Sequence, residues 1–272
     1  MSRRVELHCH SVFSDGVLTP AELVERAKAN GVDTLVLTDH DSVSGGPDLF
    51  AAGELHGLDV RLAIEINCAG EGAADRVHVL GYGIDPASPG FAARLAEFRE
   101  RRTVRAKLMV DTLRALGHAV TYEDVAASAH ETVGRPHVAD ALKRAGIVKS
   151  RKEAFDRFLA KGKLGYVDSM GPSPAEAIAL IRDAGGTACL AHPQTAGKAP
   201  ELDALLALGL QGVEVFYGGH TPSQVRAYGD WATSAKLLTV GGTDFHGPGT
   251  GREARMGVDY DAALWDALQS TL

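Results

Sequence analysis

The chain of 272 residues is long enough for one large α/β domain, or for one domain that carries an insertion. Its net charge of −7 at pH 7 argues against a general polyanion-binding surface, although a local basic pocket for a phosphate is compatible with it. No apolar run approaches the ~20 residues of a membrane-spanning helix, and the polar start "MSRR" leads us to expect no secretory signal. Cys9, Cys68 and Cys189 lie in apolar runs and predict buried thiols of a cytoplasmic protein.

Short apolar runs alternate with helical patterns over the first 90 residues. We expect strands at VELHC (5–9), DTLVLTD (33–39), RLAIEINC (61–68) and RVHVLGYG (76–83). The link AGEGAAD between the last two is too short for a helical crossover, so these two strands are predicted to form a hairpin. Helices are expected from Pro20, with Thr19 as its N-cap, and from Ser42 to His56.

The alternation stops between residues 91 and 168, where only helical patterns are found. A long helix is predicted from Phe91 towards Gly117, and shorter helices after Thr121 and near Pro136 and Ser150. This segment is rich in Arg and Lys although the whole chain is acidic. We predict that residues 91–168 form an all-helical insertion, or lid subdomain, in a domain made of residues 1–90 and 169–272.

Strands and helices alternate again in the last third of the chain. Strands are expected at GTACLAH (186–192), QGVEVFY (211–217) and KLLTVGGTD (236–244). The helices expected between them are Pro174–Asp183, Glu201–Leu208 and Pro222–Ala235. Repeated strand–helix units over this length predict an α/β fold with a parallel barrel or a doubly wound sheet.

Side chains that bind metal ions recur near the ends of these strands. His8 and His10 are two residues apart and therefore share one face of a strand. The full candidate set is His8, His10, Asp15, His40, Glu65, His78, His192, Asp244 and His246. The carboxyl ends of parallel barrel strands meet at one mouth, so these ligands can converge. Nitrogen and oxygen ligands without a thiolate suit manganese, iron or zinc. Nine of them are too many for one ion, so we expect two or three divalent ions, with manganese as our first choice and Glu65 as a bridge.

Six motifs, taken in order along the chain, resemble those of the PHP (polymerase and histidinol phosphatase) metal-dependent phosphoesterases. They are HCHSVFSDG, TDHD, IEI, HVLGY, AHP and TDFH. The resemblance covers nearly the whole chain and implies a distorted (β/α)7 barrel with a multinuclear metal site. It implies three ion positions, held by His8, His10, Glu65 and Asp244, by Glu65, His78 and His192, and by Asp15, His40 and His246. Asp39 is expected behind His40 or close by. Some relatives have His at the position of Asp15, and many have Gly at that of Ala63.

The segment from Gly134 to Val167 resembles the insertion of the bacterial stand-alone branch of this family. That resemblance implies nucleoside monophosphates, 3′,5′-bisphosphonucleotides and 5′ ends of short RNA or DNA as substrates. Arg135 and His137, in a Gly-Arg-Pro-His turn before a helix, are predicted to contact substrate phosphate. His220 in FYGGHTP is a further candidate that could reach the mouth.

The predicted reaction is in-line attack on phosphorus by a hydroxide held between the metal ions. A metal-bound water, His137 or His220 could protonate the leaving oxygen. Lys161 and Lys163 are weaker candidates for substrate contact, because KGK is typical of a solvated helix end.

Three alternatives remain open from the sequence. Histidinol phosphate is the second substrate choice within the family. A metal-dependent amidohydrolase also uses HxH and strand-end His and Asp, but no Lys stands at a convincing strand end. The third is a metal-stabilised binding module or polymerase-associated subunit. The partners expected are small phosphorylated molecules, with neither a membrane nor an obligate protein partner inferred.

Overall fold

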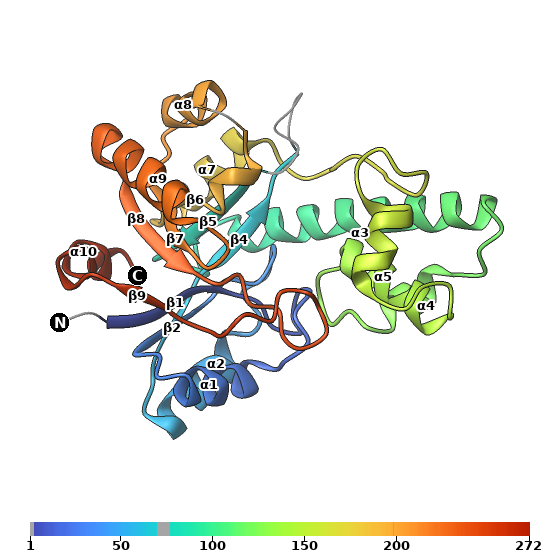
Figure 1. Cartoon of the computed structure of the whole chain (residues 1–272), viewed down its shortest axis with the longest axis horizontal. Coiled ribbons are helices and arrows are strands. Elements are labelled where there is room, and N and C mark those ends of the chain that lie inside the picture. The colour runs from blue at the N-terminus through green and yellow to red at the C-terminus, as the bar shows by residue number, and fades with distance from the viewer. Residues whose placement is uncertain (1–2, 70–76, 198) are drawn as a thin grey trace.

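Figure 1 shows the computed structural model of the chain, which describes residues 3–69, 77–197 and 199–272. Its strands form a four-stranded sheet of order β3-β2-β1-β9 and a five-stranded sheet of order β4-β5-β6-β7-β8. The strands are β1 (Arg3–Cys9), β2 (Thr34–Leu37), β3 (Asp59–Leu62), β4 (Ile64–Asn67), β5 (His78–Tyr82), β6 (Thr187–Leu190), β7 (Gly212–Tyr217), β8 (Leu238–Gly242) and β9 (Val258–Tyr260).

Helices cover these sheets and form a separate segment at one side (Figure 1). They are α1 (Pro20–Ala29), α2 (Gly46–His56), α3 (Phe91–Ala115), α4 (Tyr122–Ala126), α5 (Arg135–Arg144), α6 (Arg151–Ala154), α7 (Pro174–Asp183), α8 (Ala199–Ala207), α9 (Pro222–Ala235) and α10 (Ala262–Leu268). Shorter helical turns are η1 (Phe155–Leu159), a π-helix, and the 3₁₀ turns η2 (Pro193–Thr195) and η3 (Gln269–Thr271).

Several predicted helix ends are confirmed by their caps. The Thr19 side chain accepts from the N–H of Glu22 at the start of α1, and Pro20 occupies its first turn. Helices α7 and α9 have the predicted bounds. Helix α2 begins at Gly46 and not at Ser42, because the Ser42 hydroxyl accepts the N–H of Ser44 in a preceding turn.

The predicted strand over residues 61–68 is wrong, because it is two strands in different sheets. β3 pairs in parallel with β2, whereas β4 pairs antiparallel with β5. The predicted hairpin of β4 and β5 is thereby confirmed, although most of its link, residues 70–76, lies outside the described residues. β9 and α10 were not predicted from the sequence, since a three-residue strand gives too short a pattern.

The two sheets approach each other at their edges. Isolated parallel bridges join Cys9 with Phe245 and His40 with Glu65. β1 and β8 lie so close that a Cβ on Gly242 would stand 2.6 Å from the backbone nitrogen of His8, which explains a glycine at this point. Within the described residues, no hydrogen-bonded ladder closes the sheets into one barrel. The fold is therefore mixed α/β, with parallel and antiparallel pairs.

Helix α3 joins the two parts of the molecule. Its first half buries Phe91, Leu95 and Phe98 in the core beside the five-stranded sheet. Its second half packs in another apolar cluster, which includes Met109, Leu113 and side chains of α5 and η1. The predicted division at residues 91 and 168 stays a prediction, but the helical segment does have an apolar cluster of its own.

The cysteines and the helices bear on two further expectations. Cys9, Cys68 and Cys189 are buried and free, as predicted. Across the described ranges, no helix combines the length and the apolarity of a membrane span. α3 has 25 residues but carries many charges.

Candidate metal centre

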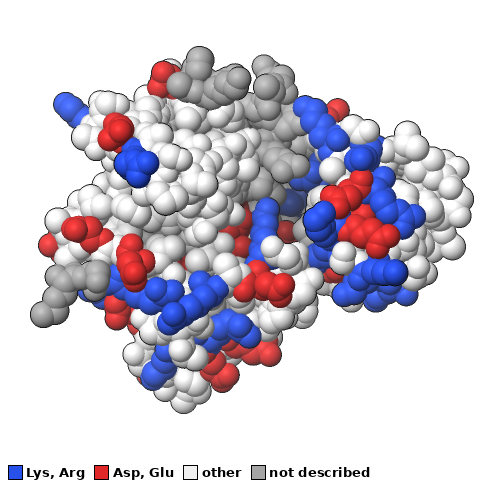
Figure 2. Space-filling view, in the orientation of Figure 1, with Lys and Arg blue, Asp and Glu red and all other residues white. Residues whose placement is uncertain are grey.

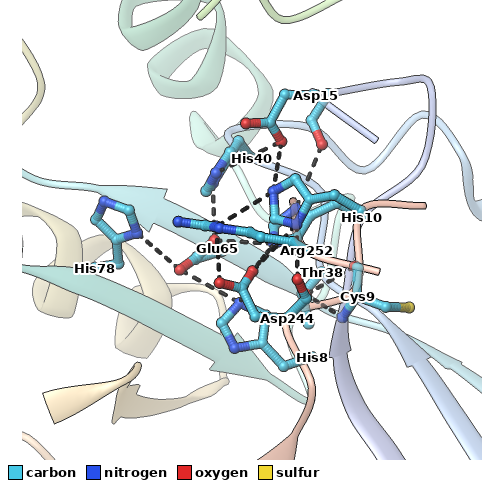
Figure 3. Close-up of polar contacts among 12 residues, drawn as sticks. His8, Cys9, His10, Asp15, Thr38, His40, Glu65, His78, Asp244 and Arg252 are labelled. Atoms are coloured by element: carbon cyan, nitrogen blue, oxygen red, sulfur yellow. Dashed lines mark hydrogen bonds and ion pairs between the residues drawn. The ribbon is translucent and has the colours of Figure 1, made fainter. Parts of the chain in front are cut away.

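All nine predicted ligands lie together where strands of the two sheets begin or end. Figure 3 labels seven of them. His8 comes from β1, Glu65 from β4 and His78 from the start of β5. The remaining six lie in the loops that directly follow β1, β2, β6 and β8. Eight of the nine residues are buried, and His78 is partly buried. Strands, and the loops that directly follow them, thus position these side chains.

Glu65 lies at the centre of this group. Five imidazole nitrogens surround its carboxylate at 2.9–3.4 Å. They belong to His8, His78 and His192 near Oε1 and to His10 and His40 near Oε2. A single carboxylate cannot hydrogen-bond five rings with good geometry, but it can bridge ions that these rings bind.

Two further carboxylates flank Glu65. Asp244 Oδ1 lies 3.4 Å from His8 Nε2 and 3.2 Å from His10 Nε2. Asp15 Oδ1 lies 3.1 Å from His246 Nε2 and 3.8 Å from His40 Nε2. Together with Glu65, these buried acids would carry a large desolvation cost unless cations faced them.

The facing atoms of this group lack hydrogen-bond partners although they are buried. Six such atoms belong to the centre, namely His8 Nε2, His10 Nε2, Asp15 Oδ1, His40 Nδ1, Glu65 Oε2 and Asp244 Oδ1. An unsatisfied buried polar atom costs about 1–3 kcal/mol, and six in one place need an explanation. Nitrogen and oxygen lone pairs that converge without hydrogen-bond geometry fit divalent metal ions.

The ligand atoms form three sets, and the atoms of each set all lie within 4.8 Å of one another. These are His8, His10, Glu65 and Asp244; His40, Glu65 and His78; and His10, Asp15, His40 and His246. The first set equals the one that the family resemblance implies. In the second, His40 takes the place expected for His192, whose Nε2 lies 3.2 Å from Glu65 Oε1. The third set contains His10 in addition to the three residues that the resemblance implies.

The acid–base properties of the group reflect burial opposed by charge. Burial alone would lower the pKa of His10, but the carboxylates of Asp244 and Glu65 raise it to about 9. Burial lowers the pKa of His78 to about 3, so this ring is neutral near pH 7. Burial would raise the pKa of Glu65, but the imidazoles of His40 and His8 hold it well below its ordinary value. Metals bind the ionised carboxylate and the neutral imidazole, so an ion bound here would displace the proton of His10.

Asp39 supports the loop after β1 and does not lie against His40 as its partner. Its carboxylate accepts from the N–H and hydroxyl of Ser11 and, at 2.6 Å, from the hydroxyl of Ser14. Ser14 Oγ in turn lies 3.4 Å from His10 Nδ1. Burial raises the pKa of Asp39. Asp39 therefore lies close to His10 through Ser14, and its predicted supporting role at the centre stays a prediction.

The two histidines predicted as substrate or proton-transfer residues have other partners. His137 is buried, and its Nδ1 accepts the N–H of Gly134 at 3.0 Å, which caps α5. His220 donates from Nδ1 to the Val215 carbonyl at 2.9 Å, and its Nε2 lies beside Gln194. These contacts give both residues structural roles in their own loops, and their predicted roles in substrate binding or proton transfer stay predictions.

Two charged residues near the centre were missed in the sequence. Glu214 on β7 contacts His8 and His192, and Arg252 contacts Asp244 Oδ2 at 2.7 Å. Figure 3 shows the Arg252 side chain extending across the centre. A lone Glu within the apolar run QGVEVFY was a usable signal for the first. Arg252 lies on a glycine-rich loop that gives no strand or helix pattern to place it.

A cleft of about 390 Å³ opens beside the centre. Asp15, His40, His78 and His246 line one side of it. The other lining residues include seven cations, Arg102, Arg105, Arg135, Arg151, Lys152, Lys161 and Arg252. Figure 2 shows Lys and Arg gathered around the hollow between the sheets and the helical segment. The cleft thus joins an acidic, histidine-rich floor to a cationic rim and suits a phosphorylated ligand.

Comparison with known proteins gives the same family. The PHP domain model matches residues 6–170. A 3′,5′-nucleoside bisphosphate phosphatase of Chromobacterium violaceum is 36% identical over 254 residues, which cover 91% of this chain and 88% of that protein. A 5′-3′ exoribonuclease of Haemophilus influenzae is 34% identical over 91% of this chain and 92% of its own length.

Two solved structures are similar over nearly the whole chain. One, from Bifidobacterium adolescentis, is described as a candidate metal-dependent phosphoesterase, with a TM-score of 0.89, 34% identity and coverage of 98% and 96%. The other, from Chromobacterium violaceum, is described as an amidohydrolase with bound sulfate and no metal, with a TM-score of 0.87, 33% identity and the same coverage. The family model spans more than half of this chain, and its relatives include phosphate-ester hydrolases, so the chain is an enzyme of the PHP domain family.

Proposed function

We propose that this enzyme hydrolyses phosphate monoesters of nucleotides with the help of bound metal ions. AMP, 3′,5′-bisphosphonucleotides and 5′ ends of short oligonucleotides are the proposed substrates. The observation that carries the proposal is the buried Glu65 carboxylate, which five imidazoles surround at 2.9–3.4 Å. Two of these rings, His40 and His78, line the cationic cleft. The names of the similar proteins support the nucleotide as substrate.

The proposed ligands divide by the three sets of close atoms. His8, His10, Glu65 and Asp244 would hold one ion, and Glu65, His78, His192 and His40 a second. Asp15, His40, His246 and His10 would hold a third. Manganese is the proposed ion, with iron or zinc as alternatives. Bound ions of this kind activate a water molecule and neutralise phosphate charge.

The rim would bind and orient the substrate. Arg135 occupies the first turn of α5, where helix N–H groups add to its charge. Its guanidinium lies 5.6 Å from the Phe155 ring and 6.0 Å from the Tyr166 ring, so aromatic surface meets positive charge in the cleft. A nucleotide carries both features, a flat ring system and a phosphate. We assign the protonation of the leaving oxygen to neither His137 nor His220, because each of them has a hydrogen bond within its own loop.

The finer architectural predictions belong to the same proposal. We propose a distorted (β/α)7 barrel whose mouth carries the metal centre, with residues 91–168 as its lid. The separate apolar cluster of the helical segment supports that division. The buried free thiols support the predicted cytoplasmic location.

A substrate panel tests the proposal. Metal-stripped protein is incubated with AMP, 3′,5′-bisphosphoadenosine, a 5′-phosphorylated oligonucleotide or histidinol phosphate, with and without Mn²⁺. We expect phosphate release that depends on Mn²⁺ and is fastest with a nucleotide. Fastest release from histidinol phosphate would contradict the substrate assignment.

The description of one similar structure as an amidohydrolase favours one further control. A set of amide and lactone substrates is tested in parallel under the same metals. Turnover of an amide without any phosphate release under Mn²⁺, Fe²⁺ or Zn²⁺ would contradict the proposed reaction.

A further inference from the structure

Glu214 is a fully buried carboxylate outside the nine proposed ligands. It lies on β7, where the pairing with β8 shifts register between Glu214 and Phe216. Such irregularities re-aim side chains and are frequent beside active sites. A buried glutamate in an apolar strand is costly without partners, so its contacts indicate what it is for.

Both oxygens of Glu214 are used by proposed metal ligands. Oε1 lies 3.0 Å from His8 Nδ1, and Oε2 accepts the backbone N–H of His192 at 2.7 Å. The rings of His8 and His192 are stacked, with centroids 5.7 Å apart. One carboxylate therefore contacts a ligand from each of two proposed ion positions.

The contact with His8 determines which ring nitrogen faces the centre. An imidazole Nδ1–H that donates to a carboxylate leaves Nε2 with its lone pair for an ion. His8 Nε2 is one of the six facing atoms without a hydrogen bond, 3.4 Å from both Glu65 Oε1 and Asp244 Oδ1. The carboxylate of Glu214 thus supports the metal-binding tautomer.

The contact with His192 fixes a strained backbone. His192 has φ of 27° and ψ of 66°, a conformation that residues other than glycine rarely adopt. The hydrogen bond from its N–H to Glu214 holds the peptide in place while the ring reaches Glu65. The Thr195 hydroxyl lies 2.9 Å from the other ring nitrogen.

We propose that Glu214 is a positioning residue that couples two metal positions, by orienting His8 of one and His192 of the other. The proposal rests on the metal-dependent function above. Loss of the carboxylate should weaken both positions together, whereas loss of a ligand used by one position alone should weaken that one first.

Glu214→Gln is the test variant, since glutamine has the same size but only one acceptor oxygen. It can accept from His8 or from His192, and its amide then faces the other donor. Glu6→Gln is the matched control. Glu6 is also fully buried, but its carboxylate accepts backbone N–H groups of His8, Thr243 and Gly257 and the Thr243 hydroxyl. Within the part of the chain that the structure describes, no hydrogen bond or ion pair joins it to a ligand side chain.

Mn²⁺ binding to the metal-stripped full chain is followed by calorimetry and electron paramagnetic resonance, without substrate. We expect Glu214→Gln to lower the affinity of two positions about 10–100-fold, while folded Glu6→Gln stays near the wild type. Unchanged affinity, or loss at one position only, would overturn the coupling. If wild-type protein binds no Mn²⁺, the proposed function fails instead.

A second measurement does not depend on a variant that folds. In zinc-loaded wild-type protein, long-range ¹H–¹⁵N spectra identify which nitrogen of each histidine holds the metal. We expect Nε2 coordination for His8 with a protonated Nδ1. Coordination through Nδ1 would contradict the proposed role of Glu214.

Discussion

The metal centre, called the floor below, and the cationic rim of the cleft beside it are built in different ways. Strand ends position the floor, and its side chains are nearly all fully buried, with His78 the most exposed at 16%. Helices and a glycine-rich loop position the rim, where the Arg252 side chain is 47% exposed. The floor thus has the rigidity that metal geometry needs, and the rim has the reach that a substrate needs.

The two regions also differ in charge. The floor brings three carboxylates together, and the rim brings seven Arg and Lys to the same cleft in a chain of net charge −7. Several rim residues come from the helical segment, among them Arg102, Arg135 and Lys161. In the proposed function, the sheets therefore supply the chemistry and the helical segment selects the ligand.

The largest expected effect comes from the middle of the floor. Glu65→Gln removes the charge that five imidazoles share, so we expect it to lose bound metal and at least ~10³-fold of kcat. Metal content by mass spectrometry and phosphate release measure the two losses. His220→Gln, outside both regions, should retain metal and activity. Near wild-type turnover by Glu65→Gln protein that has lost its metal would contradict the assignment of the chemistry to the floor.

Next is Arg151, which joins the rim to the floor. Its guanidinium donates to both oxygens of Asp140 at 2.8 and 2.7 Å and to the carbonyl of Asp15 at 3.1 Å. Arg151→Met leaves Asp140 unpaired, and we expect about 2–3 kcal/mol less free energy of unfolding. Urea unfolding measures this, with the smaller Asp140→Asn change as comparison. An unchanged midpoint would show that the two regions are not mechanically joined here.

A rim residue should affect substrate and not metal. We expect Arg135→Ala to lower kcat/KM about 10–100-fold, because it removes one proposed charged hydrogen bond to the substrate phosphate. The metal content should stay unchanged. Arg157→Ala is the control, because Arg157 is paired with Glu153 and is not among the residues that line the cleft. Loss of metal in Arg135→Ala would contradict the division of roles.

The smallest effect concerns an exposed ion pair between α7 and the first half of α3, outside both regions. Glu176 of α7 accepts from the Ser173 N–H at its helix cap and pairs with Arg94 of α3 at 3.1 Å. The cap and then the Arg94 charge lower the pKa of Glu176 below its ordinary 4.5. The stabilisation is therefore present above pH 4.5 and is lost as pH falls through the lowered value. We expect Glu176→Gln to cost under ~1 kcal/mol at pH 7 and less at a pH below 4.5, as thermal unfolding would show. An equal cost at both pH values would exclude the charge as its cause.

The floor could be predicted from the sequence because its residues follow strand patterns. His8 and His10 alternate around Cys9, and Glu65, His192 and Asp244 stand in or after apolar runs, so topology alone brings them together. The sequence could not show that residues 61–68 change sheet at Ala63, since an apolar run looks the same in either sheet. It could not show that the ring nitrogens of His137 and His220 are used by a cap and a carbonyl.

The most direct measurement is anomalous diffraction from crystals of the full chain grown with Mn²⁺. The account predicts two or three manganese peaks, with Glu65 bridging at least two of them and His8, His40 and Asp244 among the ligands. No peak beside Glu65, with Mn²⁺ bound elsewhere or not at all, would contradict the proposal that these buried carboxylates and imidazoles form the metal centre.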